Sequence, residues 1–262
     1  MLTSVRSLMA ASMLAGSVLA ASPALADDAD TAVKPAPAFT VTGNVALVTD
    51  YRFRGVSLSG GDPAVQGGIT LNHSSGLYIG TWSSSLASTP VYGDQELDLF
   101  GGWTGEVASG LTLDAGLLYY VYPSGHVGDG NYWEPYASIS GSLGPAKLKL
   151  GVAYDWKQKG LINNAGSRDD NLYVYTNLDV GVPTTPITLS AHLGYTDGVL
   201  SPCYYCTGTA TFGDKTGWDW SIGGSATVLG PISVGVSYIG VSGASIDGYT
   251  NDTIVGTLSA SF

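Results

Sequence analysis

Short stretches in which apolar and polar residues alternate follow one another along the chain after residue 38. Successive side chains of a β-strand point to opposite faces, so this period of two predicts strands with one apolar and one polar face. We count twelve such strands and find no helical segment of note. Their predicted bounds are residues 40–54, 65–73, 76–87, 95–107, 111–122, 132–142, 146–156, 171–182, 187–196, 217–229, 232–241 and 253–262.

The connections between these strands are alternately short and long. The short ones contain Gly, Pro, Ser or Thr, which favour tight turns, and lie at residues 74–76, 108–110, 143–145, 183–186 and 230–231. The long ones lie around residues 60–63, 89–94, 123–131, 157–170, 197–216 and 242–252. This pattern predicts an all-β fold, a transmembrane antiparallel up-and-down β-barrel with both termini periplasmic. A secreted soluble β-sandwich shares much of the composition but does not explain the alternation.

The two faces of the predicted strands separate charge from apolar side chains. Apolar residues such as Val45, Leu150 and Val236 fall on the face expected to meet lipid, and charged residues fall on the other. A charge on the lipid face would cost about 2–4 kcal/mol near the bilayer midplane. The residues predicted to line the lumen or a constriction are Asp50, Arg52, Arg54, Glu96, Asp98, Asp114, Lys147, Lys149, Tyr173, Tyr175 and Asp179.

The acids outnumber the bases in this lumen set, which favours cations or neutral polar solutes. Asp50, Arg52 and Arg54 share one parity, so all three should point inward from the first strand. They form either an ion-pair network that stiffens the barrel or a constriction that orients a solute. Tyr173 and Tyr175 either stack against sugars or fill space. Small inward residues, including Gly151 and Gly194, favour open space.

Aromatic residues on the outward face concentrate near the long connections, as in a girdle at the level of lipid headgroups. They are Tyr51, Phe53, Tyr119, Trp133, Tyr154, Tyr195, Trp218, Trp220 and Tyr238.

The amino-acid composition limits the kinds of partner that the protein can bind. The formal net charge is −11 and charged residues are 12% of the chain, about half the usual ~25%. Because nucleic-acid binding needs a basic surface, no nucleic-acid partner is expected.

The chain divides into three predicted parts. Residues 1–26 have a basic start, an apolar stretch and an Ala-Leu-Ala ending, which together predict a secretory signal peptide. Residues 27–38 are a periplasmic tether, and residues 39–262 are the barrel. Cys203 and Cys206 form a C-x-x-C motif without the further ligands of a zinc site, so we interpret them as a loop disulfide.

The last predicted strand ends on Phe262, which resembles the C-terminal signature of bacterial outer-membrane β-barrels. The resemblance implies that Phe262 is an assembly signal read by the barrel-assembly machinery. The segments 45–55, 61–68 and 73–78 (VALVTDYRFRG, GDPAVQGG and HSSGLY) resemble the TorF-type porin family of proteobacterial outer membranes. That family is poorly defined in function, so the resemblance supplies no site residues.

We therefore expect a porin-like channel in the bacterial outer membrane, passing small polar or cationic solutes through a narrow lumen. Its partners are outer-membrane lipid, lipopolysaccharide and those solutes. One alternative is a non-conducting structural or adhesive barrel. Another is a barrel-embedded hydrolase that uses His73 beside Ser74 and Ser75, but no nucleophile elbow is present and no enzyme is expected. No metal or other cofactor is expected, because no ligand motif occurs.

Overall fold

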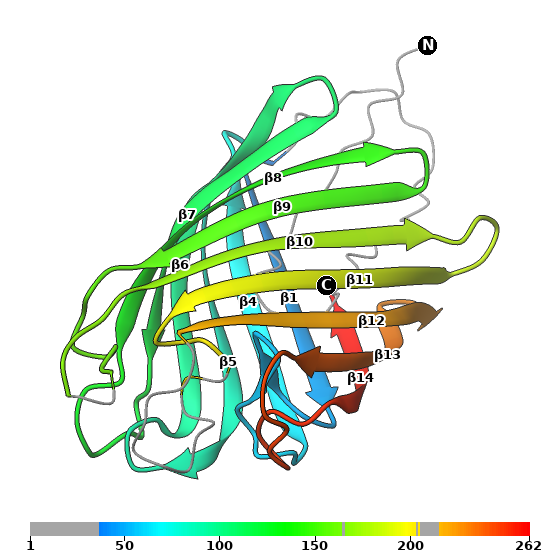
Figure 1. Ribbon diagram of the computed structural model, residues 1–262. Coiled ribbons are helices and arrows are strands. Elements are labelled where there is room, and N and C mark those ends of the chain that lie inside the picture. Colours follow the sequence, from blue (N-terminus) through cyan, green and yellow to red (C-terminus); the bar gives the residue numbers. More distant parts are fainter. Residues whose placement is uncertain (1–36, 164–165, 203, 205–214) are drawn as a thin grey trace.

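The computed structural model describes residues 37–163, 166–202, 204 and 215–262. Twelve long antiparallel strands close into one barrel, and a two-stranded hairpin lies apart from its wall (Figure 1). The barrel strands are β1 (Phe39–Val48), β4 (Ala64–His73), β5 (Leu77–Thr89), β6 (Gly93–Ala108), β7 (Leu111–Val121), β8 (Tyr132–Leu143), β9 (Ala146–Asp155), β10 (Asn171–Gly181), β11 (Ile187–Gly198), β12 (Thr216–Leu229), β13 (Ile232–Val241) and β14 (Thr253–Ser261). The hairpin is β2 (Arg52–Phe53) and β3 (Val56–Ser57).

Each barrel strand pairs with its neighbours in sequence, and β1 closes the cylinder between β14 and β4. Val45 is the register partner of Ala260 on one side and of Gly67 on the other. The predicted antiparallel β-barrel fold and its number of strands are thus confirmed, and the periplasmic placement of the termini stays a prediction. The first and last barrel strands begin and end at the rim formed by the short turns (Figure 1).

Two predicted element bounds are wrong. The first barrel strand ends at Val48 instead of residue 54, because residues 49–63 turn into the barrel and form β2 and β3 there. We call residues 49–63 the inner segment. The connection expected around residues 89–94 is only residues 90–92, because β5 and β6 extend past a register shift between Ser85 and Thr89 and pair again at Thr89 and Gly93.

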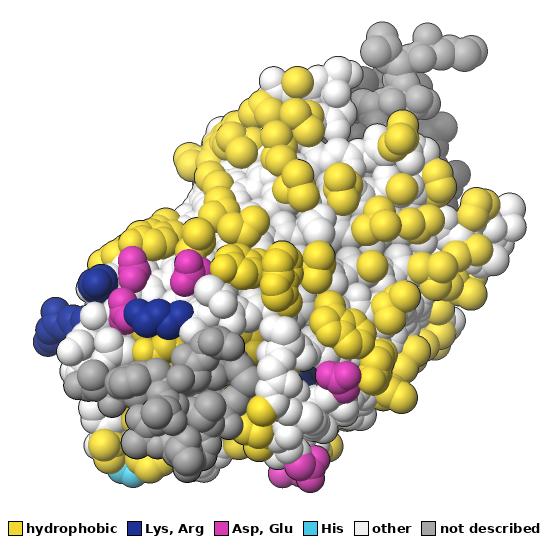
Figure 2. Space-filling view, in the orientation of Figure 1, with side chains coloured by type: hydrophobic (Ala, Val, Ile, Leu, Met, Phe, Trp, Pro, Cys, Tyr) yellow, Lys and Arg dark blue, Asp and Glu magenta, His cyan; other side chains and the backbone are white. Residues whose placement is uncertain are grey.

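The outer surface of the barrel wall is apolar, as the alternation predicts. Val45, Leu150 and Val236 are each at least half exposed, and apolar side chains cover much of the wall in Figure 2. Two of the predicted girdle residues are placed wrongly. Tyr51 is buried inside the barrel, and Phe53 packs edge-on against the ring of Tyr120 in the interior. Both belong to the inner segment, so the parity of a wall strand does not apply to them.

Phe262 continues the ladder at the seam between β14 and β1. Its backbone N–H donates to the Gly43 carbonyl (2.9 Å), and the Gly43 N–H donates to the Phe262 carbonyl (2.8 Å). Its ring lies over Gly43, where a Cβ would come within 2.6 Å of Phe262 Cζ. Glycine therefore allows the ring to pack across the strand. The role of Phe262 in assembly stays a prediction.

Three of the sequence predictions fall on other parts of the chain. The signal peptide, most of the tether and the cysteine pair Cys203–Cys206 lie outside the described residues. Within the described ranges, no helix is long and apolar enough to cross a membrane.

Candidate functional site

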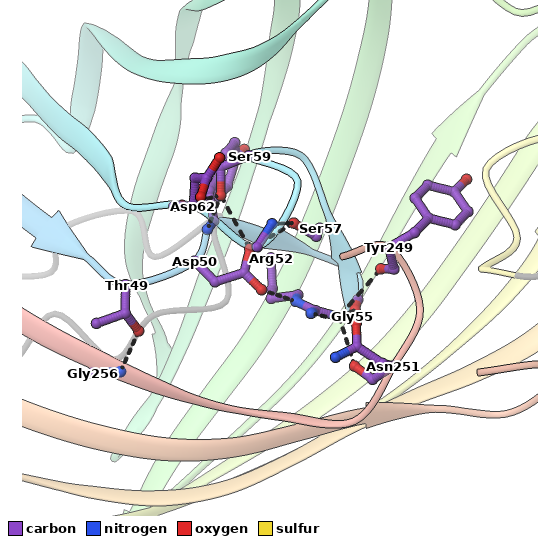
Figure 3. Close-up of polar contacts among 12 residues, drawn as sticks. Thr49, Asp50, Arg52, Gly55, Ser57, Ser59, Asp62, Tyr249, Asn251 and Gly256 are labelled. Carbon is purple, nitrogen blue, oxygen red and sulfur yellow. Dashed lines mark hydrogen bonds and ion pairs between the residues drawn. The ribbon is translucent and has the colours of Figure 1, made fainter. Parts of the chain in front are cut away.

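The inner segment is organised around the carboxylate of Asp50. Ser57 Oγ donates to Asp50 Oδ1 (2.6 Å), Ser59 Oγ donates to the same atom (3.1 Å), and Arg52 Nε donates to Oδ2 (2.6 Å). Figure 3 shows these side chains converging inside the barrel. One buried carboxylate thus joins the start of the segment to both strands of the hairpin.

The hairpin turns through Arg54 and Gly55, between the register partners Phe53 and Val56. Both turn residues have positive φ, 48° and 80°. This is the handedness of a two-residue type I′ turn, which matches the twist of paired strands. Gly55 packs against the wall, because a Cβ there would come within 2.2 Å of Val241 Cγ1. Glycine is thus needed for both conformation and space.

Arg52 fastens the hairpin to the connection between β13 and β14. Its Nη1 donates to the carbonyl oxygens of Gly55 (3.1 Å), Tyr249 (3.2 Å) and Asn251 (2.9 Å), and Nη2 donates to Asn251 Oδ1 (3.2 Å) (Figure 3). Arg52 is 3% exposed, and its guanidinium has a carboxylate partner and several carbonyl acceptors. A buried arginine satisfied in this way holds one geometry.

Arg54 crosses the lumen to the opposite wall. Its Nη2 forms an ion pair with Glu134 of β8, and its Nη1 lies 3.9 Å from Asp155 Oδ2 of β9. The guanidinium carbon also lies 4.2 Å from the ring centroid of Tyr173 on β10 and 4.7 Å from that of Phe53. Arg54 therefore ties the inner segment to three wall strands, β8, β9 and β10. We call this set of contacts the latch.

A second link joins the inner segment to β6. Tyr51 OH donates to Glu96 Oε1 (2.8 Å), and Tyr122 OH donates to Glu96 Oε2 (3.3 Å). Asp98 is the next inward residue of β6 and is also buried. Glu96 thus fixes Tyr51 of the inner segment to β6, and Asp98 is buried on the same strand.

At the level of the inner segment, every wall strand contributes a buried inward residue. The cross-section of the barrel is therefore filled there. We call this ring the closed layer. Its members are each at most 7% exposed: Val48, Ala64, Ser84, Glu96, Tyr120, Glu134, Asp155, Tyr173, Thr196, Asp219, Ile239 and Val255.

The half of the lumen nearer the short turns is accessible and polar. We call it the vestibule, and we define it by Thr42, Asn44, Lys149, Asn177, Asp179 and Ser190, all partly exposed. Asp179 accepts a hydrogen bond from Ser190 Oγ (2.7 Å) and is the register partner of Lys147. Hydroxyl, amide and charged side chains therefore line this accessible half of the lumen.

Asp114 lies between the closed layer and the vestibule. Tyr78 OH donates to Asp114 Oδ1 (2.6 Å), and Tyr78 and Tyr136 share a further hydrogen bond between their hydroxyl groups. Tyr78 projects from β5 and Tyr136 from β8, and together the two side chains narrow the lumen.

Tyr173 and Tyr175 stack with ring centroids 5.5 Å apart, and each covers a glycine of a neighbouring strand. A Cβ on Gly194 would come within 2.2 Å of Tyr173 Oη, and one on Gly151 within 2.3 Å of Tyr175 Cζ. The prediction that Gly151 and Gly194 leave open space is therefore wrong, because tyrosine rings occupy it. Tyr173 is buried beneath Arg54, whereas Tyr175 is partly exposed.

The structure brings the predicted site residues into two groups. Asp50, Arg52, Arg54, Glu96, Asp98 and Tyr173 meet in or beside the closed layer, while Asp114, Lys147, Lys149, Tyr175 and Asp179 lie in or next to the vestibule. The alternation also indicates that Glu134 and Asp155 point inward, but their pairing with Arg54 depends on a hairpin that the pattern does not reveal.

His192 forms a polar cluster that the candidate set omits. Its Nε2 lies 2.8 Å from Asp219 Oδ1 and 2.9 Å from Tyr173 OH, and its Nδ1 lies 2.5 Å from Asn177 Oδ1. These contacts join β10, β11 and β12 under the closed layer. The inward parity of His192 and Asp219 is the signal that could have found them.

His73, considered for a hydrolase, makes its hydrogen bonds within the turn between β4 and β5. Its Nδ1 lies 2.8 Å from Ser75 Oγ and accepts a hydrogen bond from the Ser75 backbone N–H (3.2 Å). Among the described residues, no group of three or more His, Cys, Asp or Glu side chains is arranged to hold a metal ion.

A twelve-stranded closed barrel with a polar interior and an apolar exterior has the fold of porins. The NanC porin is similar, with a TM-score of 0.58 and 10% identity over 85% of this chain and 99% of that one. The KdgM porin gives 0.53 and 9% over 85% and 98%. The KdgM porin in complex with disordered oligogalacturonate gives 0.54 and 8% over 85% and 98%.

The sequence identifies the family. Residues 32–261 match the family described as "Bacterial protein of unknown function (Gcw_chp)", and the chain belongs to it. A search of curated proteins gave no match.

Proposed function

We propose that this protein is an outer-membrane channel of the porin type, closed by its inner segment, and that it passes small polar or cationic solutes when that segment moves. One observation carries the proposal. A polar vestibule leads to a single filled layer, and the filling is a hairpin held to the wall by ion pairs and hydrogen bonds. Such contacts can be exchanged for water when the segment moves, while the apolar side chains that it also buries, Tyr51, Phe53 and Val56, would become exposed.

The charges of the closed layer suggest the selectivity of the open state. Movement of the hairpin out of the lumen would withdraw Arg52 and Arg54 together, because both lie on it. The inward acids left on the wall at this level are Glu96, Asp98, Glu134, Asp155 and Asp219. A ring of carboxylates favours cations in a pore.

The exterior supports placement in the outer membrane of a Gram-negative bacterium. Apolar wall residues and the exposed aromatic residues Trp133, Tyr154 and Trp218 match the lipid band and girdle of such barrels. We also propose that the protein is a porin of the TorF type.

The acidic layer distinguishes the proposed solutes from the acidic sugar of the KdgM complex. A carboxylated sugar would meet carboxylates where the lumen is narrowest. Neutral sugars, amino acids without net negative charge, and amines are the solute classes we propose.

A swelling assay with proteoliposomes tests the solute classes. We expect amines and neutral polar solutes of low mass to enter faster than anions of equal size, and entry to rise when the latch is weakened. Equal entry of uronic acids and amines through the latch-weakened barrel would contradict the proposed selectivity.

The filled layer also favours a second candidate, a non-conducting structural barrel. In that case the ion pairs brace the wall permanently, and no change to the inner segment that preserves the fold would yield a conducting barrel.

A further inference from the structure

The positive charges on the outside of the barrel are gathered in one place. Apart from the lumen residues, the described ranges include four Lys and Arg side chains, and all four are exposed: Lys157, Lys159, Arg168 and Lys215. The first three lie in the connection between β9 and β10, and Lys215 directly precedes β12. Figure 2 shows Lys and Arg side chains grouped at the end of the molecule that bears the long connections. We call these four residues the basic cluster.

The segment that bears the basic cluster is held against the wall. The side chain of Gln158, between Lys157 and Lys159, clamps the backbone of Trp133: Trp133 N–H donates to Gln158 Oε1 (2.8 Å), and Gln158 Nε2 donates to the Trp133 carbonyl (2.7 Å). Leu161 is 2% exposed, and its carbonyl accepts from the Asp169 N–H (3.1 Å). The cations therefore project from an ordered base.

Asp169 joins two of the cations from different connections. Its Oδ2 lies 2.5 Å from Lys215 Nζ, and its Oδ1 lies 3.7 Å from Lys157 Nζ. Both lysines remain more than half exposed. One carboxylate thus holds two ammonium groups near each other while leaving them open to a further anion.

The basic cluster adjoins the aromatic girdle. Trp133 and Trp156 are 40% and 42% exposed, and Trp156 is next to Lys157 in the chain. The ring of Trp133 stacks on Tyr119 with centroids 4.2 Å apart. Tyr and Trp favour the headgroup level of a membrane, so the cations lie where lipid phosphates lie.

We propose that the basic cluster binds the phosphate groups of a phosphorylated glycolipid of the outer leaflet, of the lipopolysaccharide class. The site depends on the outer-membrane placement in the proposed function but not on solute passage. Charge complementarity identifies the occupant, because exposed acids in the other connections, such as Asp62, Asp129 and Asp247, would repel phosphates. Even with Asp169, Asp170 and the exposed Asp197 beside Lys215 included, the cluster keeps an excess of one positive charge.

Binding of fluorescent lipopolysaccharide to the full barrel in uncharged detergent tests the site. The variant Lys157→Gln/Lys159→Gln/Arg168→Gln/Lys215→Gln is compared with wild type and with the lumen control Lys147→Gln/Lys149→Gln. Two further ligands are measured. One is the same glycolipid after removal of its phosphates, and the other is inorganic phosphate as a competitor. Heat-dependent gel migration establishes folding, and Lys157→Gln/Lys159→Gln, which leaves the Lys215–Asp169 pair, replaces the fourfold variant if that does not fold.

We expect the fourfold variant to lose at least tenfold in affinity and the lumen control to match wild type, since each basic residue near an anionic surface contributes on the order of fivefold. We expect dephosphorylated glycolipid to bind wild type as weakly as phosphorylated glycolipid binds the variant. Equal binding by wild type and variant, or by the two glycolipids, would overturn the proposal. Complete competition by millimolar inorganic phosphate would overturn the assignment to a lipid. None of these readouts depends on conduction, so a failure here is separate from a failure of the channel proposal.

Discussion

At the scale of single residues, the latch depends on one ion pair that is almost fully buried. Arg54 is 5% exposed and Glu134 is 3% exposed, so neither charge is solvated by bulk water. Removal of one partner of such a pair typically costs about 3–5 kcal/mol, because the remaining charge stays buried and unpaired. In this barrel the unpaired charge can instead be solvated if the hairpin moves.

Glu134→Gln keeps the size of the side chain and its acceptor for Tyr120 OH (3.1 Å) but removes the charge opposite Arg54. We expect the frequency of channel openings in planar bilayers to rise at least tenfold. Glu106→Gln, an exposed glutamate at the other end of β6, is the control and should leave the frequency unchanged. An unaltered record for Glu134→Gln in a folded barrel would argue that Arg54 is not a latch.

In the lumen, tyrosine rings pack against glycines of neighbouring strands, and Gly116 is one of these glycines. A Cβ on Gly116 would come within 2.3 Å of Tyr136 Oη and 2.6 Å of the Gly101 carbonyl oxygen, whereas one on Gly235 would meet nothing closer than 3.5 Å. We expect Gly116→Ala to lower the free energy of unfolding by about 1–3 kcal/mol, as overpacking does. Gly235→Ala is the matched control in urea unfolding, and equal losses for the two variants would contradict this packing account.

At the scale of elements, the connection between β9 and β10 is tied to the start of β12 through Asp169. The hydrogen bond from Lys215, the largest cause, lowers the pKa of Asp169 well below its usual range, and the same bond raises the pKa of Lys215. Because the folded-state pKa of the carboxyl is depressed, the pair stabilises the connection above the unfolded pKa of about 3.9. That contribution is lost as the pH falls toward the folded-state value.

A carbon-13 titration of the Asp169 carboxyl tests this sign. We expect a midpoint well below that of free aspartate in wild type and a return toward the free value in Lys215→Ala. The same midpoint with and without Lys215 would show that the pair is not formed in solution.

At the scale of the whole molecule, the alternating pattern predicts most of the fold because wall residues obey a single rule. Lipid on one side and a polar lumen on the other impose the period of two on every strand, so twelve strands and their facing can be predicted. The inner segment escapes this rule. Asp50 to Arg54 keeps the alternation of a strand, yet its hydrogen bonds go to Ser57, to Glu134 and to the carbonyls of the last long connection. Glu134 and those carbonyls are distant in sequence from the segment, and nothing local marks them as its partners.

The apolar exterior predicts that a charge on the outer face of the barrel costs more stability than a charge on the inner face. Ile222 is 62% exposed at the middle of β12, and its neighbour Ser221 points into the lumen. We expect Ile222→Lys to destabilise the barrel in lipid vesicles by about 2–4 kcal/mol, because it places a charge in the hydrocarbon. Ser221→Lys should cost less, and a reversed order in denaturant titrations would mean that the faces are assigned incorrectly.

The central claim is that the inner segment closes an otherwise continuous polar lumen. The most direct test is the conductance in planar bilayers of wild type and of a variant in which residues 51–60 are replaced by a short Gly-Ser linker. We expect wild type to remain mostly closed and the folded variant to give a steady, cation-selective conductance. A folded variant that conducts no better than wild type would contradict the account and favour a non-conducting barrel.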